Sequence, residues 1–124
     1  MRQIKFRGKD AVTGNWVYGY FLRFDGLNYI YPFTNNLYEK AIKIIVGTEG
    51  QYTGLKDKNG KAIYDGDILQ FKEKEGFGNG VVEYRYCSFY AKYLNGLAEG
   101  GFDLMKHKWK IIGNIYENPE LIKS

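Results

Sequence analysis

The chain has 124 residues, of which 44% are hydrophobic and 18% aromatic, and its formal net charge at pH 7 is +4. That length and apolar content fit one compact domain or two small subdomains and argue against disorder. One cysteine excludes an intramolecular disulfide, the N-terminus lacks an apolar signal segment, and no apolar run approaches the roughly 20 residues of a membrane helix. We therefore expect a soluble cytoplasmic protein with no membrane partner.

The first part of the chain predicts a β-meander. Residues 3–7 alternate apolar and polar side chains, and residues 16–22 and 27–31 are rich in aromatic and β-branched ones, so each segment favours a strand. An Asp-Gly turn signal at residues 25–26 joins the second strand to the third. Residues 39–46 fit both a helical and an extended spacing, and their Ile and Val content favours a strand.

The segment from Tyr52 to Leu69 contains two turn signals. The Asn59-Gly60 pair favours a tight hairpin turn because both positions tolerate positive φ, and Asp57 can cap that turn. The Asp65-Gly66 pair is a second signal of the same kind, and residues 67–71 then have strand composition. We predict a connection ending in a hairpin, then a short strand, a turn and a longer strand.

Residues 72–79 are charged and then glycine-rich, which predicts a loop before the remaining strands. Those strands are expected at residues 80–86, 88–94, 102–105 and 109–116, and the Asn118-Pro119 pair favours one terminal helical turn.

Short strands separated by regular turn signals predict an all-β fold. The strand order of the second half resembles a small SH3-like barrel, and the first half would be a β-meander packed on it. We place the boundary near residues 47–50, which gives an N-terminal β subdomain at 1–50 and a C-terminal barrel subdomain at 51–124.

The central segment also resembles the YopX family of small phage and prophage proteins. The residues that carry the resemblance are Tyr52, Gly54, Leu55, Asp57, Asn59, Gly60, Ile63, Tyr64, Gly66, Asp67 and Ile68. Residues 1–7 and 112–121 are similar to the opening strand and the closing segment of that family. The resemblance implies a phage or prophage origin in a bacterial host, a mainly β fold and a non-secreted protein. The family brings no established activity, so it supplies no catalytic residue.

Candidate chemical groups have simpler explanations as turn or surface residues. A calcium loop with Gly60 at its sixth position would place Gly66 where an acidic residue is needed, so Asp57 and Asp65 are better interpreted as turn formers. Cys87 and His107 cannot complete a four-ligand zinc site. The glycines of residues 76–80 lack the lysine and hydroxyl residue of a phosphate loop. We therefore predict no catalytic residue, no metal ligand and no cofactor.

Aromatic and basic residues alternate in several of the expected strands. Exposed rings on a sheet can stack on bases while Lys and Arg contact phosphates, although strand alternation alone also produces this pattern. The candidate nucleic-acid contacts in the second half are Arg85, Tyr86, Tyr90, Lys92, Lys108, Trp109 and Lys110.

Two functional hypotheses follow, and an enzyme ranks behind both because nothing selects a nucleophile, a base or a metal. The favoured hypothesis is a non-enzymatic accessory protein that forms homo-oligomers and binds phage or host proteins, because its 22 aromatic rings exceed what a small core hides. The alternative is a nucleic-acid-binding β-barrel protein of phage DNA or RNA metabolism or regulation.

Overall fold

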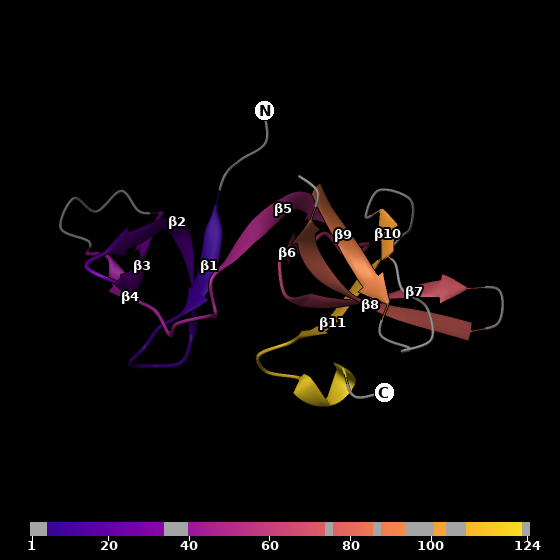
Figure 1. The fold of residues 1–124 in the computed structure, drawn as a ribbon. Helices are drawn as coiled ribbons and strands as arrows, with labels where there is room; N and C mark the ends of the chain where they lie inside the picture. Colours follow the sequence, from indigo (N-terminus) through magenta and orange to yellow (C-terminus); the bar gives the residue numbers. More distant parts are fainter. Residues whose placement is uncertain are drawn as a thin grey trace. The chain divides into compact units, whose positions relative to one another are not determined.

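The computed structural model describes residues 5–33, 40–73, 76–85, 88–93, 101–103 and 109–122. It confirms an all-β chain with two antiparallel sheets (Figure 1). Two compact units are present, Met1–Tyr52 and Thr53–Ser124. Their boundary lies within strand β5 (Gly50–Lys56), two residues beyond the expected division at residue 50. Whether each unit is an independent domain stays a prediction.

The first unit contains the predicted meander. Its sheet continues into the second unit through β5, and the full strand order is β4-β3-β2-β1-β5-β6. The strands are β1 (Phe6–Lys9), β2 (Trp16–Phe24), β3 (Leu27–Pro32), β4 (Ile42–Lys43), β5 and β6 (Ala62–Tyr64). Hairpin pairing of β1 with β2 is confirmed, as is the turn between β2 and β3, where φ is 53° at Asp25 and 78° at Gly26.

The sheet of the first unit closes on itself. Ile44, just after β4, forms an isolated antiparallel bridge with Asp10, just after β1. The backbone N–H of Ala11 donates to the carbonyl of Lys43, and that of Ile45 donates to the carbonyl of Lys9. This closure leaves a narrow interior, where a Cβ at Gly8 would lie 2.5 Å from a methyl group of Ile44. The expected strand at 39–46 is therefore confirmed only in part, as β4 and this bridge.

The second unit contains a sheet of order β10-β9-β8-β7-β11. Its strands are β7 (Asp67–Glu73), β8 (Gly76–Arg85), β9 (Ser88–Tyr93), β10 (Gly101–Asp103) and β11 (Lys110–Asn114). Its buried apolar core consists of Ile63, Leu69, Phe71, Val82, Ala91 and Trp109. The SH3-like closure of this unit stays a prediction.

An expected connection and part of an expected loop are strands in the structure. Residues 52–56 belong to β5, because Tyr52 donates its N–H to the carbonyl of Lys5 and continues the pairing with β1. Residues 76–79 belong to β8, because they pair with Gln70 to Glu73 and lengthen the β7–β8 hairpin. The loop predicted from the glycine content of residues 76–79 was therefore wrong. The terminal helical turn is confirmed as a 3₁₀ turn, η1 (Pro119–Ile122).

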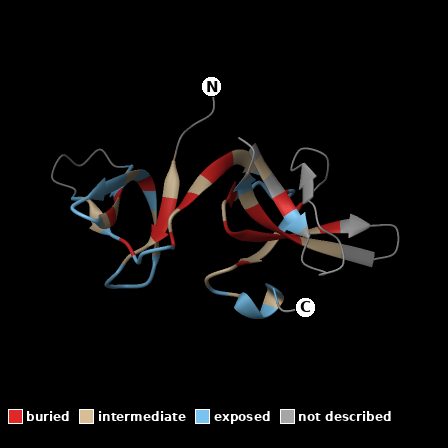
Figure 2. Cartoon of the chain, viewed as in Figure 1, coloured by how far each residue is buried: buried red, intermediate tan, exposed pale blue. Residues whose placement is uncertain are grey.

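Exposure differs between strands: Figure 2 shows many exposed residues along β2, whereas in β3 only Tyr31 is exposed. Among the described residues, no helix has the length and apolar character needed to cross a bilayer.

Candidate functional site

The outward-facing residues of β2 and β3 form the candidate site. Side chains alternate between the faces of a strand, and residues directly opposite each other in an antiparallel pair share a face. Tyr20 pairs with Tyr31, whereas Phe21 pairs with Ile30. Because Ile30 is fully buried, the set that contains Tyr20 faces away from the core. We call that set the aromatic face; its members are Trp16, Tyr18, Tyr20, Leu22, Phe24, Leu27, Tyr29 and Tyr31.

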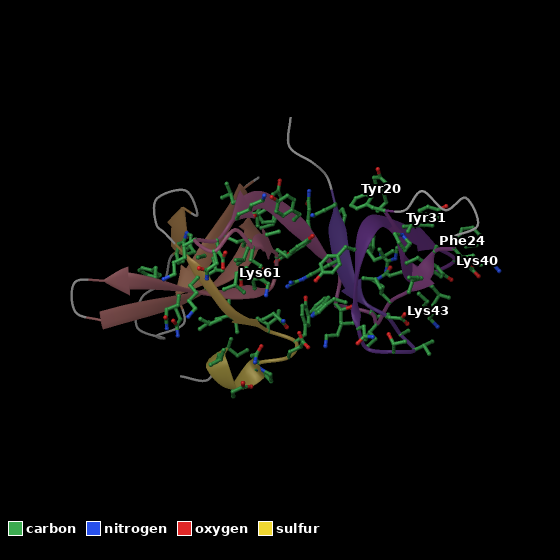
Figure 3. All side chains as sticks on the ribbon, turned by 180° about the vertical axis from the view of Figure 1, so that it is seen from behind. Tyr20, Phe24, Tyr31, Lys40, Lys43 and Lys61 are labelled. Atoms are coloured by element: carbon green, nitrogen blue, oxygen red, sulfur yellow. The ribbon has the colours of Figure 1, made fainter. Side chains whose placement is uncertain are left out.

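Four rings of the aromatic face are exposed to solvent. The exposed fractions are 70% for Phe24, 58% for Tyr20, 45% for Tyr18 and 39% for Tyr31. Phe33, just beyond β3, packs edge-on against Tyr20 with 4.6 Å between the ring centroids. Figure 3 labels Tyr20, Phe24 and Tyr31 among the side chains of this unit. The closed interior explains this exposure, because rings that do not fit inside must point outward.

The register arranges the aromatic face in rows. Tyr20 and Tyr31 form one row, Leu22 and Tyr29 form the next, and Phe24 forms the third with its β3 partner. Lys43 of β4 pairs with Tyr29 and therefore extends the middle row. Successive rows along a strand are about 6.6 Å apart. An exposed lysine thus lies level with the gap between two exposed ring positions.

Basic residues of β1 border the aromatic face on its other side. Arg7 pairs with Tyr18 and Lys9 pairs with Trp16, so the two cations share the face with those rings. The guanidinium carbon of Arg7 lies 4.3 Å from the Trp16 ring centroid, and the Nζ of Lys9 lies 5.3 Å from it. These are cation–π contacts, which hold the two side chains over the ring.

Of the three described acidic residues of the first unit, Asp25 directly follows Phe24 of the third row, and the other two are hydrogen-bonded outside the rows of rings. Asp10 accepts hydrogen bonds from the N–H groups of Val12 and Thr13 in the β1–β2 turn. Glu49 accepts from the side-chain amide of the buried Asn28, which pairs with Arg23 rather than with a ring of the aromatic face.

The third described acid of this unit, Asp25, lies in the turn beyond the ends of β2 and β3. By sequence, residues 1–52 contain seven basic and four acidic residues, so this unit carries +3 of the formal charge of +4.

Of the nucleic-acid contacts that the sequence predicted in the second half, the structure describes the side chains of Lys92, Lys110 and Trp109. Lys92 of β9 and Lys110 of β11 are exposed, but β8 and β7 separate their strands. Trp109 must be corrected: it is 2% exposed and packs on Phe71 with 4.8 Å between ring centroids, so it cannot stack on a base. Tyr86, Lys108, Cys87 and His107 lie outside the described residues, as do the side chains of Arg85 and Tyr90.

Asp57 of the predicted signature caps the β5–β6 turn and also contacts β11. Its Oδ1 accepts from the N–H groups of Asn59 at 2.9 Å and Lys61 at 2.8 Å, and its Oδ2 accepts from that of Ile111 at 3.1 Å. Burial by itself raises the pKa of Asp57. The three N–H donors, with that of Ile111 foremost, and the charge of Lys61 outweigh burial and hold the pKa below its ordinary value.

The other signature residues also have structural roles. Asp67 is 2% exposed and accepts the N–H of Tyr64, which fixes the turn at Asp65 and Gly66. Gly66 has φ 92°, and a Cβ there would approach the ring of Tyr116. Within the described part of the chain, no group of three or more His, Cys, Asp or Glu residues is placed to hold a metal ion.

Sequence reasoning missed the aromatic face because it interpreted β2 only as a strand. The available signal was the identity of alternate residues: Trp16, Tyr18 and Tyr20 alternate with the smaller Val17 and Gly19. A strand whose small residues face inward leaves its rings outside. Residue types do not predict that this sheet closes. That closure determines which face of β2 points into the interior.

Comparison with known proteins places the chain without assigning an activity. The family model described as YopX protein matches residues 5–123. No curated protein matches the chain. The crystal structure of protein EF1440 from Enterococcus faecalis is similar, with a TM-score of 0.61 and 22% sequence identity over 99% of this chain and 100% of that one. At this identity the likeness shows the fold alone.

Proposed function

Because the chain belongs to the YopX family, whose description names no activity, we propose its function from the aromatic face: it is a non-enzymatic protein that binds nucleic acid through its first unit. The observation that carries this proposal is the combination of exposed rings and basic residues on one face of β1 to β4. Rings stack on bases and cations contact phosphates, and each stacked base contributes about 1–3 kcal/mol. This face replaces the second-half surface expected from the sequence.

Self-association, which the sequence favoured, would draw on the same surplus of rings. A two-fold contact presents the same patch on both copies, so the Lys43 side chain and the other cations of one aromatic face would approach those of the other. Like charges that face each other across an interface are unfavourable. The positive charge of the first unit therefore favours a negatively charged ligand over a second copy of the chain.

We expect Tyr20→Ala to weaken binding of a labelled oligonucleotide roughly 5- to 150-fold, because one stacked base is lost. Fluorescence anisotropy with single- and double-stranded DNA and RNA at two salt concentrations measures this. The matched control is Tyr84→Ala in the second unit: Tyr84 is 51% exposed and packs edge-on against Phe89 at 4.8 Å, much as Tyr20 packs on Phe33.

Equal affinity of the Tyr20→Ala and Tyr84→Ala variants would contradict the proposal. So would a protein that binds no nucleic acid at low salt but forms a dimer that Tyr20→Ala dissociates. In that case sedimentation would identify the aromatic face as a self-association surface, as the sequence suggested. Substituting Lys92 and Lys110 by Gln tests the surface that the sequence predicted, and we expect little change because β8 and β7 separate the strands that carry these two lysines.

A further inference from the structure

The exposed part of the aromatic face consists of rings more than of charges. Arg7 is 6% exposed and Lys9 is half-buried, since both lie over the ring of Trp16. Lys43 is the exposed cation within the rows, and Lys40 is exposed in the segment before β4. A ligand that meets this face therefore meets mainly the flat surfaces and edges of aromatic side chains.

A duplex does not suit such a surface. Its bases are stacked on one another inside the helix, and a protein that binds it without reading sequence relies on many phosphate contacts. The aromatic face offers few exposed cations for that purpose. A single strand is different, because its bases can be splayed out and stacked on protein rings, with fewer charged contacts required.

The rows supply two stacking positions and, at the end of the row between them, a cation. Tyr20 and Tyr31, with Phe33 packed against Tyr20, form the first position, and Phe24 forms the second. Four residues of extended strand separate Tyr20 from Phe24, which is about 13 Å. Lys43 belongs to the row between the two positions. Leu22 lies directly between the two positions on β2, so Lys43 flanks the gap from β4, two strands away.

We propose that the aromatic face binds single-stranded nucleic acid in preference to duplex, with bases stacked at Tyr20–Tyr31 and at Phe24 and a connecting phosphate at Lys43. This inference rests on the proposed function and adds the class of ligand. DNA and RNA strands share the chemistry that the face recognises, since every base has a π-face.

The test compares four fluorescein-labelled probes by anisotropy: oligothymidylate and oligouridylate 12-mers, and mixed-sequence DNA and RNA hairpins whose 12 base pairs are closed by a non-nucleotide linker and which therefore contain no unpaired base. We expect the single strands to bind at least about tenfold more tightly than the hairpins at equal salt. The slope of log Kd against log salt should lie near 0.7 to 1.4, because each phosphate contact to a single strand contributes about 0.7 and the exposed cations are Lys43 and Lys40. Comparing the two 12-mers shows whether the natural strand is DNA or RNA.

Three variants locate the site. Phe24→Ala should weaken single-strand binding about tenfold and leave hairpin binding nearly unchanged, whereas Tyr20→Phe, which keeps the ring, should bind as the wild type does. Lys43→Gln should lower the salt slope by about 0.7. Its matched control is Lys61→Gln, because Lys61 is an exposed lysine of the second unit (Figure 3). Thermal melting of each variant checks that it folds, which the exposure of Phe24 and Tyr20 favours.

The outcomes separate this inference from the proposed function. Hairpins that bind as tightly as single strands, with binding still lost in Tyr20→Ala, would overturn the single-strand preference and leave nucleic-acid binding intact. Absence of binding to all four probes at low salt would overturn both. An unchanged salt slope in the Lys43→Gln variant would show that Lys43 contacts no phosphate. The proposed arrangement of contacts would then be wrong.

Discussion

The carboxylate of Asp57 connects parts of the second unit that are distant in sequence. Its Oδ1 caps the turn between β5 and β6, and its Oδ2 accepts the N–H of Ile111, 54 residues later. Lys58 strengthens the same junction by donating its N–H to the carbonyl of Trp109. A residue that the sequence explains as a local turn former therefore also fixes the position of β11.

We expect Asp57→Ala to lower the free energy of unfolding by about 2–4 kcal/mol, because backbone donors in a buried site lose their charged acceptor. Urea denaturation measures this. Asp57→Asn is the matched control: it keeps one acceptor oxygen, so it should cost less than Asp57→Ala. Two variants with equal stability to the wild type would show that the bond to Ile111 is not maintained in solution.

The lowered pKa of Asp57 predicts how the stability lost on substitution of Asp57 depends on pH. A carboxyl group whose folded pKa lies below its unfolded value near 3.8 stabilises the fold at higher pH. That contribution is lost as the pH falls through the folded pKa. The difference in stability between the wild type and Asp57→Asn should accordingly be largest near pH 7 and shrink below pH 4. A difference independent of pH would contradict the role of the ionised form.

The pairing of β2 with β3 depends on a close backbone approach at Gly19. A Cβ built on Gly19 would lie 2.0 Å from the carbonyl oxygen of Tyr31, and backbone atoms cannot move aside as a flexible side chain can. Gly19 therefore allows the two strands to come together at the row where Tyr20 and Tyr31 meet. The geometry of the aromatic face depends on this glycine.

Gly19→Ala should cost more than about 2 kcal/mol of stability and weaken ligand binding together with it. Gly14→Ala is the control, because Gly14 has φ 76° but open space around it. There only the left-handed backbone is penalised, at about 1–2 kcal/mol, and binding should not change. Thermal unfolding measures the stability of both variants, and anisotropy measures their ligand affinity. Equal stability and equal affinity of Gly19→Ala and Gly14→Ala would refute the steric argument.

Strand positions were predictable where local chemistry determined them, and less so where pairing did. The turn signal at Asp25-Gly26 and the strand composition of residues 16–22 are local, and both elements were confirmed. The extent of β8 depends on its partner: residues 76–79 are glycine-rich, yet they extend because β7 pairs with them. The prediction that Trp109 contacts nucleic acid was wrong for the same reason, because the exposure of a side chain depends on which face of the sheet a distant strand covers.

At the scale of the whole molecule, charge and rings are divided unequally. The first unit carries most of the net positive charge and, among the residues whose burial is described, all the exposed rings except Tyr84, while the buried apolar core of Leu69, Val82 and Trp109 lies in the second. Neither feature was visible from total composition, which averages the two units. The sequence predicted nucleic-acid contacts as one of two alternatives, but it placed them in the second half.

The division into two units predicts how destabilisation spreads. Ile30→Ala and Leu69→Ala each remove a fully buried side chain, one in each unit, and each should cost about 2–5 kcal/mol locally. In hydrogen exchange we expect Ile30→Ala to lower amide protection in β2 and β3 and Leu69→Ala to lower it in β7 and β8. Loss of protection throughout the chain in both variants would show a single cooperative domain.

The two tryptophans give the chain an optical reporter in each unit. Trp16 lies on the aromatic face beneath Arg7 and Lys9, whereas Trp109 is buried against Phe71 in the other unit. Emission from Trp16 should be quenched by a ligand stacking nearby, and emission from Trp109 should change only when its core opens. A Trp109→Phe variant would thus let the intrinsic fluorescence of an unlabelled protein follow occupancy of the face in real time.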